Sequence, residues 1–171
     1  MTERDYTESS YREKLVEHIF IVEVLQEMWA RQKQVVEVLR SEVDASGYDL
    51  VLECGDIVRH VQLKSSRAGS KTSRQNVNIA LVRKPAGCVI WIIIDEDRQG
   101  RFHLSYRFFG GGPREALPSL EGFGMAKHTK ADATGKKAFR PALRVVNKGQ
   151  FRPAKTTGEL VDLLFKCQQP S

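Results

Sequence analysis

Seven consecutive apolar residues, from Cys88 to Ile94 (CVIWIII), constrain the fold of this chain more than any other stretch. A strand with one face in water alternates apolar and polar residues, whereas a continuous apolar run indicates a strand covered on both faces. The run is also too short for a membrane span, which takes about 20 residues. We therefore expect a central strand that is covered on both faces by other elements of the protein.

Two stretches upstream of this run predict a β-hairpin. Residues 48–54 (YDLVLEC) and 57–66 (IVRHVQLKSS) are rich in β-branched and apolar residues, and a turn signal lies between them. Because side chains alternate across a strand, Gln62 and Lys64 should share one face, and Val61 and Leu63 the other. Pairing of the two strands would bring Asp49 close to Gln62 and Lys64.

The other predicted elements surround this hairpin. A helix is predicted over 11–32, a strand over 35–43, a second helix over 74–84 and strands over 88–94 and 101–109. The strand over 35–43 and the hairpin make a three-stranded antiparallel meander. A short helix ending near Phe165 follows a capping-box-like start at Thr156.

The first helix carries an acid at the border of its apolar arc. The arc holds Leu15, Ile19, Val22 and Trp29 on one side and Ile21, Leu25 and Met28 on the other. At its edge, the Glu17 carboxylate can reach toward the sheet, although an ordinary boundary glutamate is the alternative. His18 falls within the arc, which favours a packed, hydrogen-bonded histidine.

The order of these residues resembles the PD-(D/E)XK nuclease superfamily, which includes restriction endonucleases and Holliday-junction resolvases. The resemblance rests on Glu17 in a first helix, Asp49 opening a strand and Gln62-Leu63-Lys64 ending the next. In the superfamily motif, an Asp is followed about a dozen residues later by Asp or Glu, any residue, and Lys. Here Gln62 replaces the usual acid, as in some branches of the superfamily. The resemblance spans roughly residues 11–95.

This resemblance implies an α/β fold with a restriction-endonuclease-like core, built as helix, three-stranded meander, helix and strand, in which a mixed central sheet is flanked by helices. It also implies a nuclease that hydrolyses DNA with Mg²⁺ or Mn²⁺. Such ions prefer hard oxygen ligands. The implied ligands are the side chains of Glu17, Asp49 and Gln62 and the carbonyl of Leu63. Lys64 would hold or deprotonate the attacking water, and Gln75, on the helix after the lysine strand, would add a polar contact.

Charge is unevenly spread along the chain. Residues 1–58 hold six Lys and Arg against thirteen Asp and Glu, whereas residues 59–171 hold 21 against eight. Basic segments of this density are typical of proteins that contact phosphate backbones, although a solubilising surface is the alternative. The predicted nucleic-acid contacts are Arg67, Lys71, Arg74, Gln75, Lys127, Lys130, Lys136, Lys137 and Arg140.

We expect one domain over residues 1–171, with a core over 11–109 and a basic C-terminal extension over 110–171. The first ten residues lack the apolar segment of a secretory signal, and three scattered cysteines do not indicate a disulfide framework, so we expect a cytoplasmic protein. Two other interpretations stay open. The chain can be a non-catalytic nucleic-acid-binding or protein-interaction module on a nuclease-derived fold, or its basic part can pair with the acidic half of a second copy in a homodimer.

Overall fold

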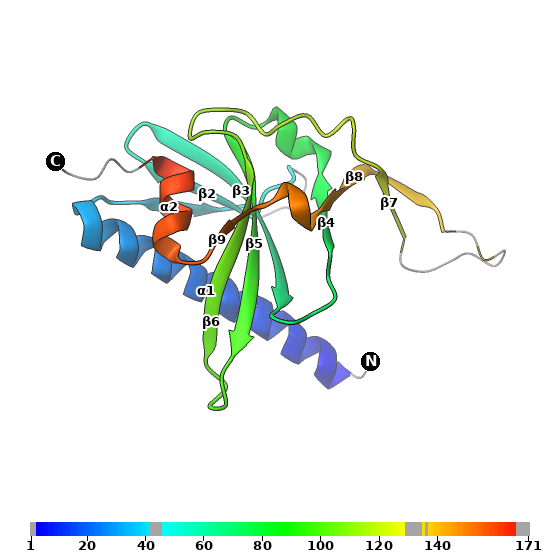
Figure 1. Ribbon diagram of the computed structural model, residues 1–171, viewed down its shortest axis with the longest axis horizontal. Coiled ribbons are helices and arrows are strands. Elements are labelled where there is room, and N and C mark those ends of the chain that lie inside the picture. The colour runs from blue at the N-terminus through cyan, green and yellow to red at the C-terminus, as the bar shows by residue number, and fades with distance from the viewer. Residues whose placement is uncertain (1–2, 42–45, 129–134, 136, 167–171) are drawn as a thin grey trace.

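The structure is a computed structural model that describes residues 3–41, 46–128, 135 and 137–166 (Figure 1). The first elements are α1 (Glu3–Gln32), β1 (Glu37–Arg40), β2 (Leu50–Cys54), β3 (Ile57–Arg67), β4 (Arg74–Asn78) and the 3₁₀ helix η1 (Ile79–Arg83). They are followed by β5 (Gly87–Glu96), β6 (Phe102–Gly110), β7 (Met125–Lys127), β8 (Phe139–Asn147), the 3₁₀ helix η2 (Lys148–Gln150), β9 (Arg152–Ala154) and α2 (Thr157–Phe165).

The main sheet has six strands in the order β1-β2-β3-β5-β6-β9. β1, β2 and β3 pair antiparallel, which confirms the predicted meander. β3 then pairs parallel with β5, and β5, β6 and β9 pair antiparallel. The α/β class and the mixed sheet predicted from the sequence are therefore confirmed.

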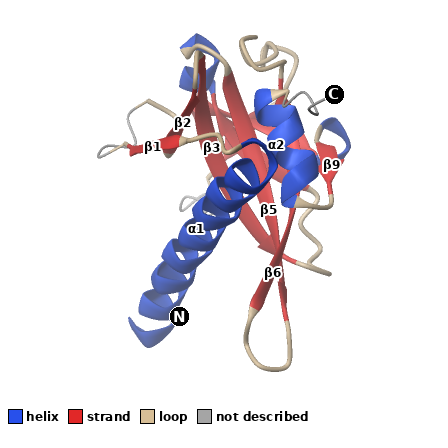
Figure 2. Cartoon of the chain, turned by 90° about the vertical axis from the view of Figure 1, so that its left-hand side faces the viewer, coloured by secondary structure: helices blue, strands red, loops and turns tan. Residues whose placement is uncertain are grey.

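Both helices cover the same face of this sheet (Figure 2). Every fourth residue of α1 from position 16 to 28 is buried, and these side chains pack with the even-numbered positions of β5 and with Leu160 and Leu164 of α2. Spacing of four residues keeps side chains on one face of a helix. The helices therefore form one layer over one face of the sheet.

The buried face of α1 differs from the predicted arc. Leu15, Val22 and Trp29 are exposed, and His18 is exposed as well, its Nδ1 2.6 Å from the Lys14 carbonyl oxygen. Because α1 has apolar residues on most of its circumference, periodicity alone could not identify the face that packs on the sheet. In the described part of the chain, no helix is both long and apolar enough to span a bilayer.

A second sheet covers the opposite face of the main sheet. It has three strands in the order β4-β8-β7. Val77 of β4 and Val146 of β8 pack with Val89 and Trp91 of β5 in a second apolar cluster. The apolar run of β5 is therefore buried on both faces, but helices lie on one side only and a sheet on the other.

The helix predicted over 74–84 is wrong. This stretch forms β4 and η1, and Asn78 between them accepts a hydrogen bond from the Ala80 N–H at 3.0 Å. The spacing of Val77, Ala80 and Leu81 fits a helical face, but Asn favours caps over helix interiors and β8 supplies a pairing partner. Tertiary pairing therefore overrides the local pattern.

The predicted basic extension takes part in both sheets. β8 pairs with β4 and β9 pairs with β6, so residues 139–154 lie against the earlier half of the chain. Figure 1 shows the β7–β8 hairpin pointing away from the main sheet. The short helix predicted near the end is confirmed as α2, where the Thr156 hydroxyl caps the Glu159 N–H at 3.2 Å.

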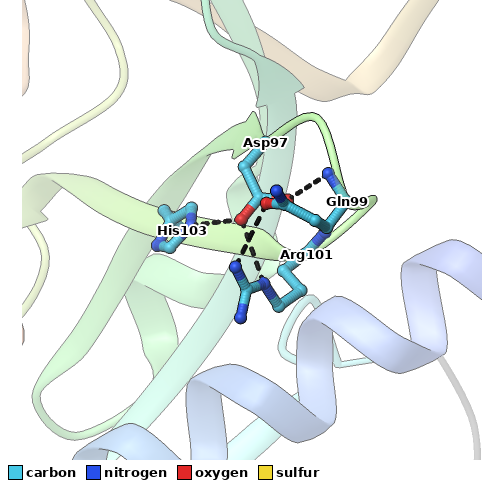
Figure 3. Close-up of polar contacts among 4 residues, drawn as sticks. All are labelled: Asp97, Gln99, Arg101 and His103. Atoms are coloured by element: carbon cyan, nitrogen blue, oxygen red, sulfur yellow. Dashed lines mark hydrogen bonds and ion pairs between the residues drawn. The ribbon is translucent and has the colours of Figure 1, made fainter.

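A network around Asp97 closes the turn between β5 and β6 (Figure 3). Asp97 Oδ1 accepts the N–H groups of Gln99 and Arg101, both at 2.9 Å. Its Oδ2 lies 3.1 Å from Arg101 Nε and 3.2 Å from His103 Nε2. Hydrogen bonds, led by that from the Arg101 N–H, hold the pKa of Asp97 below its usual value. The charged carboxylate therefore orders this exposed turn.

A buried phenol joins α1, β6 and α2. Tyr106 is 2% exposed, and its hydroxyl donates to Oε2 of Glu23. The Thr157 hydroxyl donates to the same oxygen at 2.8 Å. Burial and the Glu23 carboxylate raise the pKa of Tyr106 far above its usual value, so the phenol stays protonated and remains a donor.

Replacing Tyr106 by Phe is expected to lower the free energy of unfolding by about 1–3 kcal/mol, because a half-buried carboxylate loses one of its donors. Denaturant unfolding followed by circular dichroism measures this change. The control is Tyr11→Phe, which alters a 71% exposed side chain and should change stability by less than about 0.5 kcal/mol. Equal unfolding curves for the two variants would contradict the role given to this hydrogen bond.

Candidate active site

A cleft of about 540 Å³ opens between the first half of α1 and one edge of β3. β2 pairs with β3 only as far as the pair Leu50 and Val61, so β2 does not cover the later part of that edge. The other edge of β3 stays paired with β5 up to Arg67. The polar residues that this cleft brings together include Glu17, Asp49, Lys64, Ser65 and Gln75.

Asp49 continues the hydrogen-bonding pattern beyond the start of β2. Its N–H donates to the Val61 carbonyl at 2.8 Å, and its side-chain Oδ2 accepts the Leu63 N–H at 2.6 Å. The N–H and C=O of a strand residue point to the same edge, so the Leu63 carbonyl is also directed toward this side of β3. Carboxylate and carbonyl oxygens therefore meet at the cleft.

Gly47 allows the chain to approach η1 just before Asp49. Its φ is 76°, in the left-handed region that glycine adopts at little cost. A Cβ at this position would lie 3.0 Å from the Asn78 side chain and 3.2 Å from the Leu81 nitrogen. A larger residue at position 47 would therefore shift the segment that carries Asp49.

Glu17 reaches the cleft from α1 and is held by two cations. Its side chain is 14% exposed, its Oε2 lies 3.3 Å from Lys14 Nζ and its Oε1 lies 3.2 Å from Arg40 Nε. Glu17, Arg40 and Asp49 also line a smaller adjoining cleft of about 110 Å³. Both carboxylates thus face one region, and two basic side chains balance the charge of Glu17.

The remaining predicted residues divide into two groups. Lys64 lines the cleft, and so does Gln75, which reaches it from β4 instead of the predicted helix. Gln62 is 6% exposed and accepts the N–H of Asn78, the last residue of β4, at 3.2 Å, and it is not among the residues that line the cleft. The structure therefore brings Glu17, Asp49, Leu63 and Lys64 together but turns Gln62 toward the second sheet.

Sequence reasoning missed Lys14, Arg40 and Ser65 as residues of this region. Lys14 could have been identified, because residues three apart in a helix are neighbours on its surface. Arg40 could not, since its contact with Glu17 depends on how β1 lies against α1.

The donor set of the cleft fits a hard divalent cation. Mg²⁺ keeps several waters and takes one or two carboxylates from a protein, and the cleft is lined by the carboxylates of Glu13, Glu17 and Asp49 and by the backbone of Leu63. Within the described ranges, no three His, Cys, Asp or Glu side chains are grouped as a metal-binding cluster. The residues thus suit an ion that is largely coordinated by water and substrate, not one enclosed by protein ligands.

The predicted nucleic-acid contacts lie on two exposed surfaces. Arg67, Lys71 and Arg74 follow the end of β3, the next loop and the start of β4. Lys127 and Arg140 lie on the β7–β8 hairpin, and Lys137 lies just before β8. The Lys127 ammonium lies 5.2 Å from the centre of the Phe139 ring, which is itself 55% exposed. Lys130 and Lys136 lie outside the described residues.

No protein-family model matches this chain, and comparisons with curated proteins and with solved structures find no significant match. The geometry of the cleft and the chemistry of its residues therefore carry the functional argument.

Proposed function

We propose that this protein is a metal-dependent nuclease that hydrolyses phosphodiester bonds of DNA, on a restriction-endonuclease-like core. The observation that carries the proposal is the single cleft lined by Glu17, Asp49, Leu63 and Lys64, which come from three separate segments of the chain. In this proposal α1, the meander and the parallel strand β5 form the core, and β4 with η1 takes the place of the second helix.

The first task of such a site is to bind and orient the phosphate. Asp49 and Glu17, with the Leu63 carbonyl, would hold Mg²⁺ or Mn²⁺, which would neutralise the phosphate and polarise its bound water. Hydrogen bonding of Asp49 to the Leu63 N–H fixes the carboxylate at the edge of β3. Lys14 and Arg40 form ion pairs with Glu17, so a metal ion would compete with these two cations for its carboxylate.

Lys64 has the second task, at the attacking water. Its ammonium would place the water in line with the scissile bond and stabilise negative charge as the pentacoordinate state develops. In its neutral form it would accept a proton from that water. Gln75, which reaches the cleft from β4, would offer an amide to a phosphate oxygen or to the same water.

Two features of the site favour a second candidate function, a non-catalytic nucleic-acid-binding module on the same fold. Gln62 replaces a charged ligand and is turned away from the cleft, and Glu17 is neutralised by two cations. Each of these weakens the binding of a divalent ion, because fewer negative charges face it. The predicted homodimer, the protein-interaction role and the cytoplasmic location stay predictions.

The proposal is tested by incubating the protein with labelled single-stranded, duplex and branched DNA and with single-stranded RNA, in Mg²⁺, Mn²⁺ or EDTA. We expect cleavage of DNA with either metal and none in EDTA, with binding retained in all three conditions. Binding at two salt concentrations without cleavage of any substrate would select the non-catalytic module. Cleavage that persists in EDTA would contradict the metal-dependent mechanism.

A further inference from the structure

A second polar cleft lies beside the second sheet and is here called the basic groove. It has a volume of about 230 Å³ and is lined by Ser66 and Arg67 of β3, Trp91 of β5, Arg107 of β6 and Lys148 and Lys155 near β9, among others. Trp91 donates its indole N–H to the Ser66 hydroxyl at 2.8 Å. Since Trp91 is only 1% exposed, this pair forms a fixed floor.

The walls of the basic groove are also tied together. The Lys148 N–H donates to the Ser73 carbonyl at 2.8 Å, which joins η2 to the loop between β3 and β4. On the other side, Pro153 of β9 lies in register with Arg107 of β6. The groove is therefore bounded by secondary structure and one anchored loop.

Charge in the basic groove is of one sign. Four cations line it, Arg67, Arg107, Lys148 and Lys155, and none of its lining residues, all of which the structure describes, is Asp or Glu. Arg67 has a carboxylate neighbour only at 4.0 Å, in Glu96. Like charges brought together at a partly desolvated site repel one another, so an anion in the groove would relieve this cost.

Arg107 is the cation of the basic groove that is best placed to bind an anion. It is half-buried, and its guanidinium has no hydrogen bond or ion pair with any residue in the described part of the chain. A guanidinium presents five N–H donors that match the geometry of phosphate oxygens. A half-buried arginine without a carboxylate partner is therefore suited to bind an anionic group from outside the chain.

The basic groove continues the active-site cleft along β3. Lys64 and Ser65 line the active-site cleft, Ser66 and Arg67 line the groove, and Ser65, Ser66 and Arg67 together line a third cleft of about 280 Å³. Strand residues advance about 3.3 Å each, so Lys64 and Arg67 lie about 10 Å apart along β3.

We infer that the basic groove binds the phosphate backbone of the nucleic-acid strand that enters the active-site cleft, beside the scissile phosphate. This inference rests on the proposed function for the class of its ligand. Arg107 would make the central contact with the nucleic-acid backbone, and Lys148 and Lys155 would contact it from the side of the groove near β9. The floor of Trp91 and Ser66 gives no pattern that would select one base, so binding does not depend on base sequence.

The test compares two double variants that remove the same net charge. Arg107→Gln/Lys155→Gln alters the groove, whereas Arg83→Gln/Lys33→Gln alters two exposed residues outside it. Binding of a labelled single strand of about 16 nucleotides is followed by fluorescence anisotropy in EDTA, from about 50 to 300 mM salt. We expect the groove variant to bind about 10-fold more weakly and its log–log salt slope to fall by about 1.4, that is about 0.7 per cation. The control should match the wild type.

Equal behaviour of the two double variants, or wild-type affinity in the groove variant, would overturn the inference. Competition by polyglutamate as effective as that by DNA of equal length would also overturn it, since the groove would then serve an acidic protein. The same measurements distinguish a failure of this inference from a failure of the proposed nuclease function. Loss of binding in the groove variant of a protein that never cleaves supports the groove and rejects the nuclease, whereas cleavage with unchanged KM in the groove variant does the reverse.

Discussion

Replacing Lys64 by Ala is expected to lower the rate constant of DNA cleavage by about 10²–10⁴-fold while the affinity for DNA changes by less than about fivefold. Lys64 lies at the open edge of β3 in the same cleft as Glu17 and Asp49, where an ammonium can act on the attacking water and on developing charge. Under the proposed function, in contrast, the affinity for DNA is shared among many exposed cations. Single-turnover cleavage and anisotropy on the same substrate measure the two quantities separately.

Two further variants decide which role Lys64 plays. Lys64→Arg keeps the positive charge but cannot give up a proton at accessible pH, so it should stay inactive if Lys64 is the base and recover in part if it stabilises charge. Lys33→Ala is the matched control, since Lys33 is exposed and lies at the far end of α1, outside the cleft. Thermal unfolding of all variants checks the fold. Wild-type cleavage by folded Lys64→Ala protein would reject this site.

The part of the fold that the sequence predicts best is the meander. In β2 and β3, alternating apolar residues are separated by a short turn, so local patterning defines both the strands and their pairing. The placement of Asp49 beside the end of β3 follows from that register. The register alone does not predict the hydrogen bond from the Leu63 N–H to the Asp49 side chain, because that bond depends on the conformation of the residue just before β2.

The second sheet could not be predicted, because its strands pair over long distances in sequence. β4 pairs with β8, which begins at Phe139, about 60 residues later. The sequence of the basic stretch that contains β8 predicts only a basic extension, because a strand that pairs with a distant segment need not show local periodicity. The lack of a local signal for this pairing also explains why the sequence predicts a helix at Gln75. For the same reason, the sequence does not show that the cations of the basic groove lie together.

The position of Gln62 shows where alternation misleads. The pattern correctly places Gln62 and Lys64 on one face of β3, but the end of β4 covers that face at Gln62. Gln62 is buried there and accepts the Asn78 N–H, whereas Lys64, two residues further on, lines the cleft. A shared strand face therefore does not guarantee a shared site when a second layer covers only part of the strand.

The second large effect is expected on stability, when the buried cation Arg59 is replaced. It has no exposed surface, and it donates to the carbonyls of Gly112 and, at 3.4 Å, Gly111. Its guanidinium lies 5.4 Å from the centre of the Phe108 ring, and its Nε has no hydrogen-bond partner in the described structure. Burial raises the pKa of the neighbouring Cys88 thiol, so Cys88 stays neutral and supplies no counter-charge.

Arg59→Ala should therefore lower the free energy of unfolding by about 3–5 kcal/mol, because it leaves a cavity and two glycine carbonyls without their donor. Arg59→Met should cost at least about 2 kcal/mol less, since an apolar side chain of similar length fills the space and no charge has to be desolvated. Arg83→Ala, at an exposed arginine, controls for loss of charge. Denaturant unfolding measures all three. If Arg59→Ala and Arg59→Met lower the free energy of unfolding equally, the stabilisation by Arg59 comes from its two hydrogen bonds to the carbonyls. If Arg59→Met is as stable as the wild type, Arg59 stabilises residues 110–112 mainly by filling the space beneath them.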